Sequence, residues 1–239
     1  MSARPVPLVI AIDGPSGSGK SSVSRAVAQR LGLAYLDTGA MYRALTWWCV
    51  LREVDLDDRS AVARAAKDLP LQMATDPRSP SVQVAGVVVD QAIRETAISE
   101  SVSKVAINLG VREELCDRQR ALIAESVEST GGVVAEGRDI TTVVAPDADV
   151  RILLSANQEA RLARRAKELH GEAGHVAVSA THDQIVRRDK DDSTVSQFME
   201  AAPGVTLVDT SELDFEQSVE AVLDVIGAQT GSRTRTVQN

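Results

Sequence analysis

Residues 14–21 read GPSGSGKS and follow directly on the apolar run LVIAID at residues 8–13. The glycines, the lysine and the serine fit the spacing G-x-x-x-x-G-K-[ST], a loop whose backbone N–H groups hold phosphate. Val23, Val27 and Leu31 then recur at helical spacing. Strand, loop and helix in this order are the context in which the pattern becomes specific. The stretch therefore predicts a nucleotide-binding P-loop.

The residues of this loop have distinct expected roles. Lys20 is placed to reach the β- and γ-phosphate oxygens, and the Ser21 hydroxyl to bind the Mg²⁺ that ATP carries. We therefore expect ATP and Mg²⁺ as cofactors, with phosphate oxygens and waters completing the metal site. The residues expected to bind ATP are Gly14, Pro15, Ser16, Gly17, Ser18, Gly19, Lys20, Ser21 and Ser22.

Further apolar runs at residues 132–135, 150–154 and 205–208 alternate with helical segments. This alternation predicts an α/β fold, a P-loop NTPase-type parallel sheet with helices on both faces. Two stretches break the pattern. Residues 70–94 form an alternating segment bounded by prolines, which predicts a small inserted antiparallel unit. Residues 157–192 predict a helical lid, made of two basic helices joined by a polar connection.

Composition excludes several classes of protein. Of the 239 residues 44% are apolar and 25% charged, which is ordinary for a globular protein. The aromatic content of 3% and the net charge of -8 argue against broad nucleic-acid binding. Cys49 and Cys116 lack metal-ligand spacing and are too few for a disulfide scaffold. No signal-peptide core or membrane-length apolar run occurs, so we expect a cytoplasmic location.

The P-loop identifies the phosphate donor and leaves the reaction open. A GTPase would carry an N-K-x-D guanine reader, which this sequence lacks, and a motor would usually show an acidic strand end, which is not clear here. Transfer to a small acceptor fits the size of the chain. Arginines in three distant segments, at residues 37–43 (DTGAMYR), 134–139 (VAEGRD) and 187–192 (RRDKDD), supply the charge neutralisation that such transfer needs. We interpret three further arginines as partners in surface salt bridges: Arg161, Arg164 and Arg165.

Taken together and in order, these motifs resemble those of the bacterial cytidylate kinases, in the nucleoside monophosphate (NMP) kinase group. The resemblance runs from about residue 6 to 226, through IDGPSGSGKSS, LDTGAMYR, VAGVVVDQAIR, SVSKVA with VRE, EGRDITTVV with APDADV, RRD-x-x-DST and VDTS. It implies the reaction ATP + (d)CMP = ADP + (d)CDP, by direct transfer. It also implies small nucleotides as partners, with no nucleic acid and no membrane, and a monomer.

The resemblance implies a division of the chain as well. One kinase domain would span residues 1–228, with a core at about 6–40, 103–156 and 193–228. An NMP-binding insert would occupy about 41–102 and the lid about 157–192. A flexible tail would follow at 229–239.

Residue roles carry over where the motifs match. Catalytic roles are implied for Lys20, Arg43, Arg138 and Arg188. Substrate-binding roles are implied for Thr38, Tyr42, Arg43, Ser103, Arg112, Arg138, Asp139, Arg188 and Asp192. Among these Ser103, Arg112 and Asp139 would read the cytosine, Asp192 would bind the ribose, and Thr38 would lie near the monophosphate. Cytosine offers two acceptors and an amino donor, which an arginine with a carboxylate complements, so Asp139 should disfavour UMP.

The sequence departs from the family at one position. Relatives usually carry an arginine where Val195 follows Thr194. This difference implies a weaker grip on the ribose or phosphate. Two compensations are open: Phe198 or Met199 repacks the segment, or Arg187 replaces the missing arginine.

Two other functions are weighed against CMP phosphorylation. The first is another small-acceptor P-loop kinase, acting on a different monophosphate or on shikimate. The second is a nucleotide-binding regulatory protein with weak transfer activity. Assays with a panel of acceptors distinguish the first alternative from CMP phosphorylation. ATP binding without acceptor-dependent ADP release would favour the second.

Overall fold

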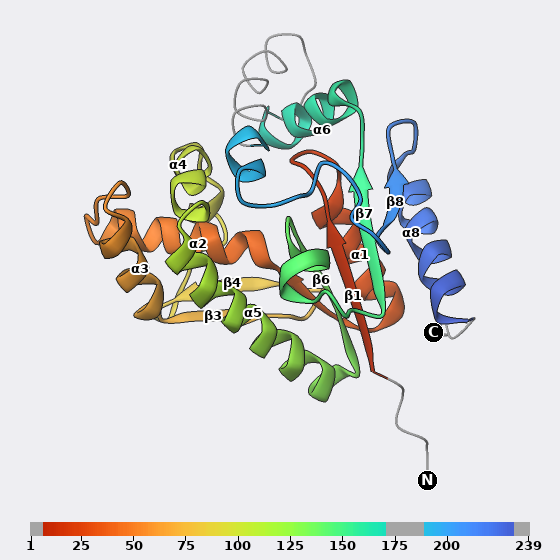
Figure 1. Cartoon of the computed structure of the whole chain (residues 1–239), viewed down its shortest axis with the longest axis horizontal. Coiled ribbons are helices and arrows are strands. Elements are labelled where there is room, and N and C mark those ends of the chain that lie inside the picture. The colour runs from red at the N-terminus through yellow and green to blue at the C-terminus, as the bar shows by residue number, and fades with distance from the viewer. Residues whose placement is uncertain (1–6, 171–188, 232–239) are drawn as a thin grey trace.

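The predicted parallel sheet forms the centre of the molecule (Figure 1). The structure is a computed structural model and describes residues 7–170 and 189–231. Within these residues the sheet order is β2-β6-β1-β7-β8, and every neighbouring pair is parallel. The strands are β1 (Leu8–Asp13), β2 (Ala34–Asp37), β6 (Gly132–Gly137), β7 (Val150–Ser155) and β8 (Thr206–Asp209).

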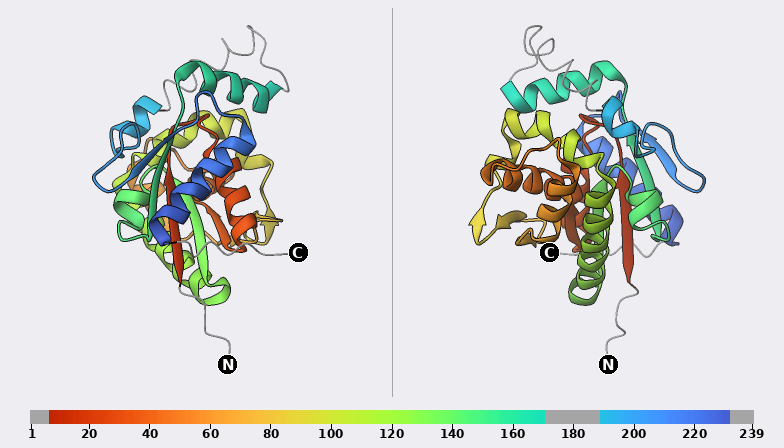
Figure 2. Two further views of the ribbon diagram at one scale, coloured as in Figure 1. Left: turned by 90° about the vertical axis from the view of Figure 1, so that its right-hand side faces the viewer. Right: turned by 60° about the vertical axis from the view of Figure 1, so that its left-hand side comes forward.

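Helices cover both faces of the sheet, as the sequence predicts (Figure 2). Successive residues of β1 point to opposite faces, so Ile10 and Ile12 join one core cluster and Ala11 the other. On the Ile10 face lie α1 (Lys20–Leu31) and α8 (Phe215–Thr230). On the Ala11 face lie α2 (Thr38–Leu51) and α5 (Leu109–Thr130). Both faces are buried, which explains the nearly continuous apolar strands.

A second, antiparallel sheet confirms the predicted inserted unit. It consists of β3 (Leu71–Ala74), β4 (Ser81–Val84) and β5 (Val87–Val88). Ala85 and Gly86 both have positive φ, at 51° and 79°, which is the geometry of a two-residue hairpin turn. Short helices flank this sheet: α3 (Arg59–Lys67), the 3₁₀ turn η1 (Ala92–Arg94) and α4 (Thr96–Ala106).

The remaining elements lie at the ends of the sheet. A π-helical turn, η2 (Ile140–Val144), follows β6, and α6 (Gln158–His170) passes above the carboxyl ends of the strands (Figure 1). Residues 189–193 are also helical. The middle of the predicted lid, including Arg187 and Arg188, lies outside the described residues. Because α8 continues to Thr230, the first two residues of the expected tail are helical.

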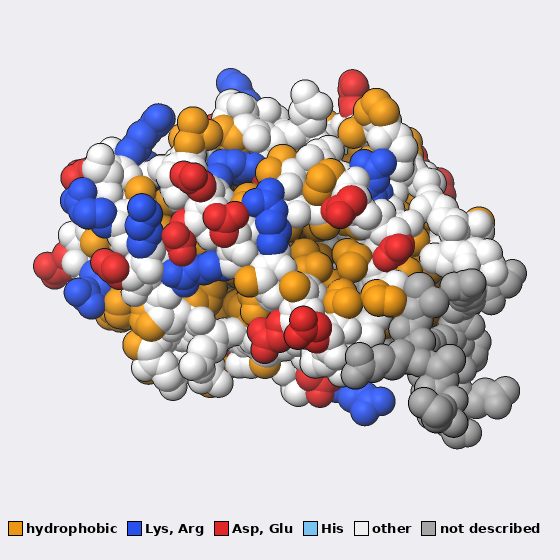
Figure 3. Space-filling model, turned by 60° about the horizontal axis from the view of Figure 1, so that its bottom comes forward, with side chains coloured by type: hydrophobic (Ala, Val, Ile, Leu, Met, Phe, Trp, Pro, Cys, Tyr) orange, Lys and Arg blue, Asp and Glu red, His pale blue; other side chains and the backbone are white. Residues whose placement is uncertain are grey.

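The end of the molecule opposite α6 carries intermixed basic and acidic side chains around an apolar hollow (Figure 3). Residues of β1, α5 and the turn after β6 line the hollow, among them Val9, Ile123, Val143 and Pro146. Across residues 7–170 and 189–231, none of the helices combines the length and the apolar character that crossing a membrane requires.

Candidate active site

The carboxyl ends of β1, β2 and β6 bring the main predicted motifs together. Asp37 pairs in register with Glu136, and Asp13 pairs with Gly137. The P-loop after β1, the DTGAMYR segment at β2 and Arg138 with Asp139 after β6 therefore start from one edge of the sheet. Open α/β sheets bind their ligands at this edge.

The P-loop has the tight backbone that phosphate binding requires. Gly17 and Gly19 have positive φ, at 77° and 89°, which other residues rarely adopt. A Cβ on Gly14 would lie 2.3 Å from the Leu154 carbonyl oxygen, and one on Gly17 would lie 2.5 Å from that of Arg161. The loop then enters α1 at Lys20, so the N-terminus of the helix faces the space beside the loop.

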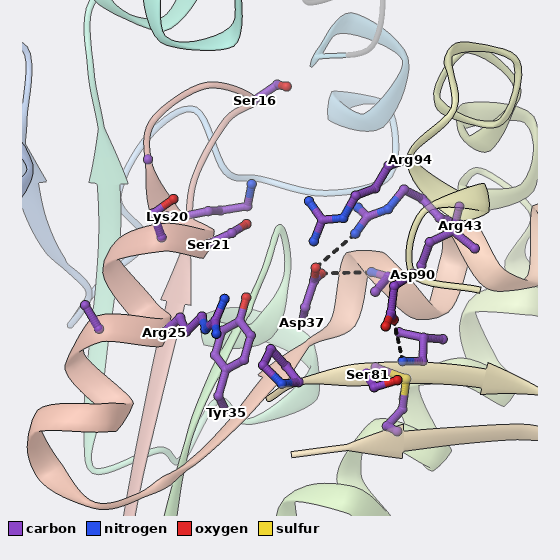
Figure 4. A pocket seen from close by; sticks show the side chains of 18 of the residues that line it. Ser16, Lys20, Ser21, Arg25, Tyr35, Asp37, Arg43, Ser81, Asp90 and Arg94 are labelled. Carbon is purple, nitrogen blue, oxygen red and sulfur yellow. Dashed lines mark hydrogen bonds and ion pairs between the residues drawn. The ribbon is translucent and has the colours of Figure 1, made fainter. Parts of the chain in front are cut away.

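A cleft of about 870 Å³ lies between the P-loop and the inserted unit (Figure 4). Lys20 and Ser21 face it from one side, and Arg43 and Arg94 face it from the other, beside Asp37. Basic side chains outnumber acidic ones along its wall, which favours an anionic ligand. The basic residues are Lys20, Arg25, Arg43, Arg94, Arg138 and Arg165, and the acidic ones are Asp37 and Asp90.

Two carboxylates lie beside Lys20 and Ser21. Glu136 Oε2 is 3.9 Å from Lys20 Nζ, and Glu136 Oε1 accepts a hydrogen bond from the Tyr35 hydroxyl at 3.2 Å. Burial raises the pKa of Glu136 above its usual value, and repulsion from Asp37 adds to this. Burial would also raise the pKa of Asp37, but Arg43, the Ala40 N–H and Lys20 together hold it below its usual value. Arg43 Nη2 donates to Asp37 Oδ2 at 2.9 Å.

A second, smaller cavity adjoins the cleft and contains most of the predicted acceptor residues. It is lined by Lys20, Thr38, Tyr42, Arg43, Arg112, Arg138, Asp139, Asp192 and Val195, among others. Arg112 Nη2 forms an ion pair with Asp139 Oδ2. Burial raises the pKa of Asp139, while the charge of Arg112 opposes this. Thr38 Oγ1 donates to the Glu136 carbonyl at 2.8 Å.

Ser103 is the predicted site residue that stands apart. It is a buried residue of α4, at 7% exposure, although its neighbours Val102 and Ala106 line the smaller cavity. Among the described residues it does not belong to that lining. Its proposed contact with the base therefore stays a prediction.

Arg138 is held from three sides. Its Nη1 lies 3.0 Å from Asp189 Oδ1 and 2.9 Å from Asp192 Oδ2, and its guanidinium carbon lies 4.5 Å from the centre of the Phe198 ring. Phe198 is fully buried, so this stacking is shielded from water. Val195 lines the smaller cavity beside Asp192.

A family profile described as cytidylate kinase matches residues 10–228 of the sequence. The chain belongs to the cytidylate kinase family. A cytidylate kinase of Streptomyces avermitilis is 46% identical over 227 residues, which cover 94% of this chain and 95% of that protein. A cytidylate kinase of Cutibacterium acnes is 49% identical over 92% of this chain and 96% of its own length. One from Rhodococcus jostii is 45% identical over 94% and 97%. The resemblance inferred from the motifs is thereby confirmed.

The structure corrects the interpretation of two arginines of α6. The sequence favours surface salt bridges for Arg161 and Arg164, but both donate to P-loop carbonyls. Arg161 Nη1 lies 3.1 Å from the Ser16 oxygen, and Arg164 Nη1 lies 3.2 Å from the Ser18 oxygen. Arg161 also pairs with Asp189, whose Oδ1 accepts the Ser16 N–H at 3.2 Å. The basic residues of α6 have the spacing of a solvent-exposed helix face. Only the docking of α6 on the P-loop shows that this face binds the loop.

The structure adds three residues to the site that the sequence motifs do not assign to it. Arg94 is the last residue of the motif VAGVVVDQAIR and lines the cleft. Glu136 is the acidic strand end that the sequence did not make clear, although it precedes Gly137 in VAEGRD. Asp37 opens DTGAMYR and caps α2 through the Ala40 N–H at 2.8 Å.

Proposed function

We propose that this chain transfers the γ-phosphoryl group of ATP to CMP and dCMP, forming ADP and the cytidine diphosphate. The observation that carries the proposal is the position of the Arg112–Asp139 ion pair. It lies in a cavity that shares Lys20, Arg43 and Arg138 with the wall of the phosphate cleft. A nucleoside monophosphate whose phosphate is held by these cations would have its base within reach of the ion pair.

The donor side would use the P-loop. The backbone of residues 14–19 and Lys20 would hold the ATP phosphates, as in other P-loop proteins. Arg161 and Arg164 support this role because they bind the Ser16 and Ser18 carbonyls and so hold the loop in shape. The proposed nucleotide contacts extend from Gly14 to Ser22.

The acceptor side would use arginines and the ion pair. Arg43, Arg94 and Arg138 would neutralise the monophosphate and the moving phosphoryl group. Arg112 donates to cytosine acceptors, and the Asp139 carboxylate accepts from its amino group. Thr38 and Tyr42 lie in the same cavity, and Asp192 would bind the ribose.

The chemistry would be a direct displacement. A phosphate oxygen of CMP attacks the γ-phosphorus, the bond to the bridging oxygen of ADP breaks, and both products leave as anions. The attacking oxygen is already ionised, so no general base is required. Lys20, Arg43, Arg138 and, by resemblance, Arg188 would stabilise the spread of negative charge. Removing one of them should cost about 10²-fold in rate.

Mg²⁺ would be held by the Ser21 hydroxyl together with phosphate oxygens. The oxygen donors at this place suit the metal, because Ser21 hydrogen-bonds Glu136, and both line the same cavity as Asp37. The bound ion would neutralise charge on the β- and γ-phosphates. We also propose that the protein acts as a cytoplasmic monomer in pyrimidine nucleotide metabolism, with the insert and lid bounds predicted above.

A coupled assay of ADP formation tests the proposal with CMP, dCMP, UMP, AMP and shikimate as separate acceptors. We expect CMP and dCMP to turn over fastest. Faster turnover with AMP or shikimate would contradict the proposed base reading. Lys20→Ala should abolish turnover with every acceptor, and ATP binding with no acceptor-dependent ADP release by the unaltered protein would favour a regulatory role.

A further inference from the structure

Asp13 is a buried carboxylate with no part in the steps above. It is the last residue of β1, directly before Gly14, and it is 1% exposed. Its Oδ1 accepts the Ile140 N–H at 2.9 Å. Its Oδ2 accepts the Thr141 N–H at 2.8 Å and the Thr141 hydroxyl at 2.6 Å. One side chain thus joins the root of the P-loop to the start of η2.

The backbone of Asp13 anchors the same segment from its other end. In the parallel pairing of β1 with β6, Asp13 lies opposite Gly137. Arg138 and Asp139 are the two residues between Gly137 and Ile140. The loop that presents them is therefore attached to Asp13 at both ends, through the sheet on one side and through the carboxylate on the other.

Close packing leaves these anchors little room to shift. A Cβ on Gly137 would lie 2.5 Å from Thr38 Oγ1 and 2.8 Å from Ile140 Cδ1. On the P-loop side, a Cβ on Gly14 would lie 2.3 Å from the Leu154 carbonyl oxygen. A change in the carboxylate removes the anchor at Ile140 and Thr141, so it should reorient Arg138 and Asp139, while packing keeps Gly14 and the P-loop backbone in place.

We propose that Asp13 is a positioning residue for phosphoryl transfer, whose carboxylate fixes Arg138 and Asp139 relative to the P-loop. Asp13 lines neither the cleft nor the smaller cavity. The inference rests on the proposed function, because it takes Arg138 and Asp139 as residues that meet the acceptor. Misplacing such groups by about 1 Å can cost roughly 10²-fold in rate.

The charge of the group explains why an aspartate is needed here. An ionised carboxylate only accepts hydrogen bonds, and all of its recorded partners are donors. The amide of an asparagine would turn an N–H₂ group toward at least one of these donors. Burial raises the pKa of Asp13 to about 6, so an assay at about pH 8 has it ionised.

The main test is Asp13→Asn, compared with the unaltered protein at about pH 8. We expect the KM for CMP to rise roughly 10-fold, kcat to fall by a similar factor and the preference for CMP over UMP to shrink. The affinity for an ATP analogue, measured by equilibrium binding, should stay within about 2-fold. An unchanged KM, kcat and base preference would overturn the inference.

A second pair of variants covers the case in which Asp13→Asn does not fold. Thr141→Val removes the hydroxyl donor, whereas Thr141→Ser keeps it. We expect Thr141→Val to show the same pattern more weakly, and Thr141→Ser to behave like the unaltered protein. Equal kinetics in the valine and serine variants would contradict the proposal.

Matched controls separate positioning from ordinary helix capping. Asp58 accepts the N–H groups of Ser60 and Ala61 at the start of α3, and Asp214 caps α8 through the Gln217 N–H. Asp58→Asn and Asp214→Asn should leave the KM for CMP and the base preference unchanged and lower the Tm only slightly, because asparagine also caps helices well. If Asp13→Asn does the same as these two, its role is structural only.

Arg138→Ala distinguishes failure of this inference from failure of the proposed function. If that variant retains full CMP turnover, the proposed acceptor site is wrong. If it loses turnover while Asp13→Asn and Thr141→Val do not, only the role of Asp13 is overturned.

Discussion

At the scale of single residues, three arginines of the cleft and the adjoining cavity are already paired with carboxylates. Arg43 contacts Asp37, Arg112 contacts Asp139, and Arg138 contacts Asp189 and Asp192. These pairs are largely shielded from water, so removing one partner leaves an uncompensated charge. A phosphate that enters the cleft must therefore compete with protein carboxylates for the guanidinium groups. The pairing also holds the arginines in defined orientations before a ligand arrives.

Val195 offers a direct test of the departure from the family. It lines the acceptor cavity beside Asp192, while Phe198 fills the space beneath Arg138. Val195→Arg adds a cation next to the proposed phosphate path, so we expect the KM for CMP to fall several-fold. Val195→Leu is the control for size. An unchanged KM in the arginine variant would indicate that stacking on Phe198 already compensates.

Asp13 should leave a signature in the pH dependence of stability. Its folded pKa of about 6 is raised from 3.8, chiefly by burial, so the folded state binds its proton more tightly than the unfolded state. The resulting stabilisation is complete below about pH 4 and is lost as pH rises through about 6, with a size of roughly 3 kcal/mol. Urea unfolding should therefore give a free energy of unfolding that falls between about pH 4 and 7 in the unaltered protein, relative to Asp13→Asn. Parallel curves for the two proteins would contradict it.

At the scale of elements, α6 and the helical residues 189–193 meet on the P-loop. Arg161 and Asp189 contact the Ser16 backbone, and Asp189 also pairs with Arg138. One buried carboxylate, that of Asp189, thus joins the P-loop, the acceptor arginine Arg138 and the two described ends of the predicted lid. This docking explains why charged residues of α6 are buried against the P-loop, although their pattern in the sequence is typical of a solvated helix.

Asp189→Asn should destabilise the ligand-free protein by roughly 3 kcal/mol, because the buried Arg161 loses its carboxylate partner and Arg138 keeps only Asp192. Saturating CMP with an ATP analogue should raise the Tm of this variant more than that of the unaltered protein, since phosphate replaces the missing charge. Thermal unfolding with and without nucleotides measures both. Asp117→Asn removes an exposed ion pair with Arg120 and should cost about 0.5 kcal/mol or less. Equal nucleotide shifts in all three proteins would contradict the expectation.

At the scale of the whole molecule, a net charge of -8 surrounds a cleft whose wall is predominantly basic. Anionic nucleotides are therefore repelled by the protein as a whole and attracted locally. The face opposite α6 shows both signs of charge intermixed (Figure 3), without a basic surface for a polyanion. The local field of the cleft should thus dominate substrate capture.

Ionic strength tests this balance. Raising the salt concentration from about 0.05 M to about 0.5 M shortens the screening length several-fold, so we expect kcat/KM for CMP to fall several-fold. Arg94→Ala should show a weaker salt dependence, because it removes one cation of the cleft. A kcat/KM that rises with salt would mean that repulsion by the whole molecule governs capture.

The sequence by itself determined the family, the parallel sheet with its inserted unit, and the P-loop. These features depend on residues close together in the chain: the spacing of GPSGSGKS, the strand period and the positive-φ glycines. Tertiary structure decided the rest. Asp13 meets Thr141 across 128 residues, and Arg161 meets Ser16 across 145 residues. Strand order, register and helix docking set these contacts, and local sequence carries no record of them, because each partner alone has the pattern of an ordinary strand end or solvated helix.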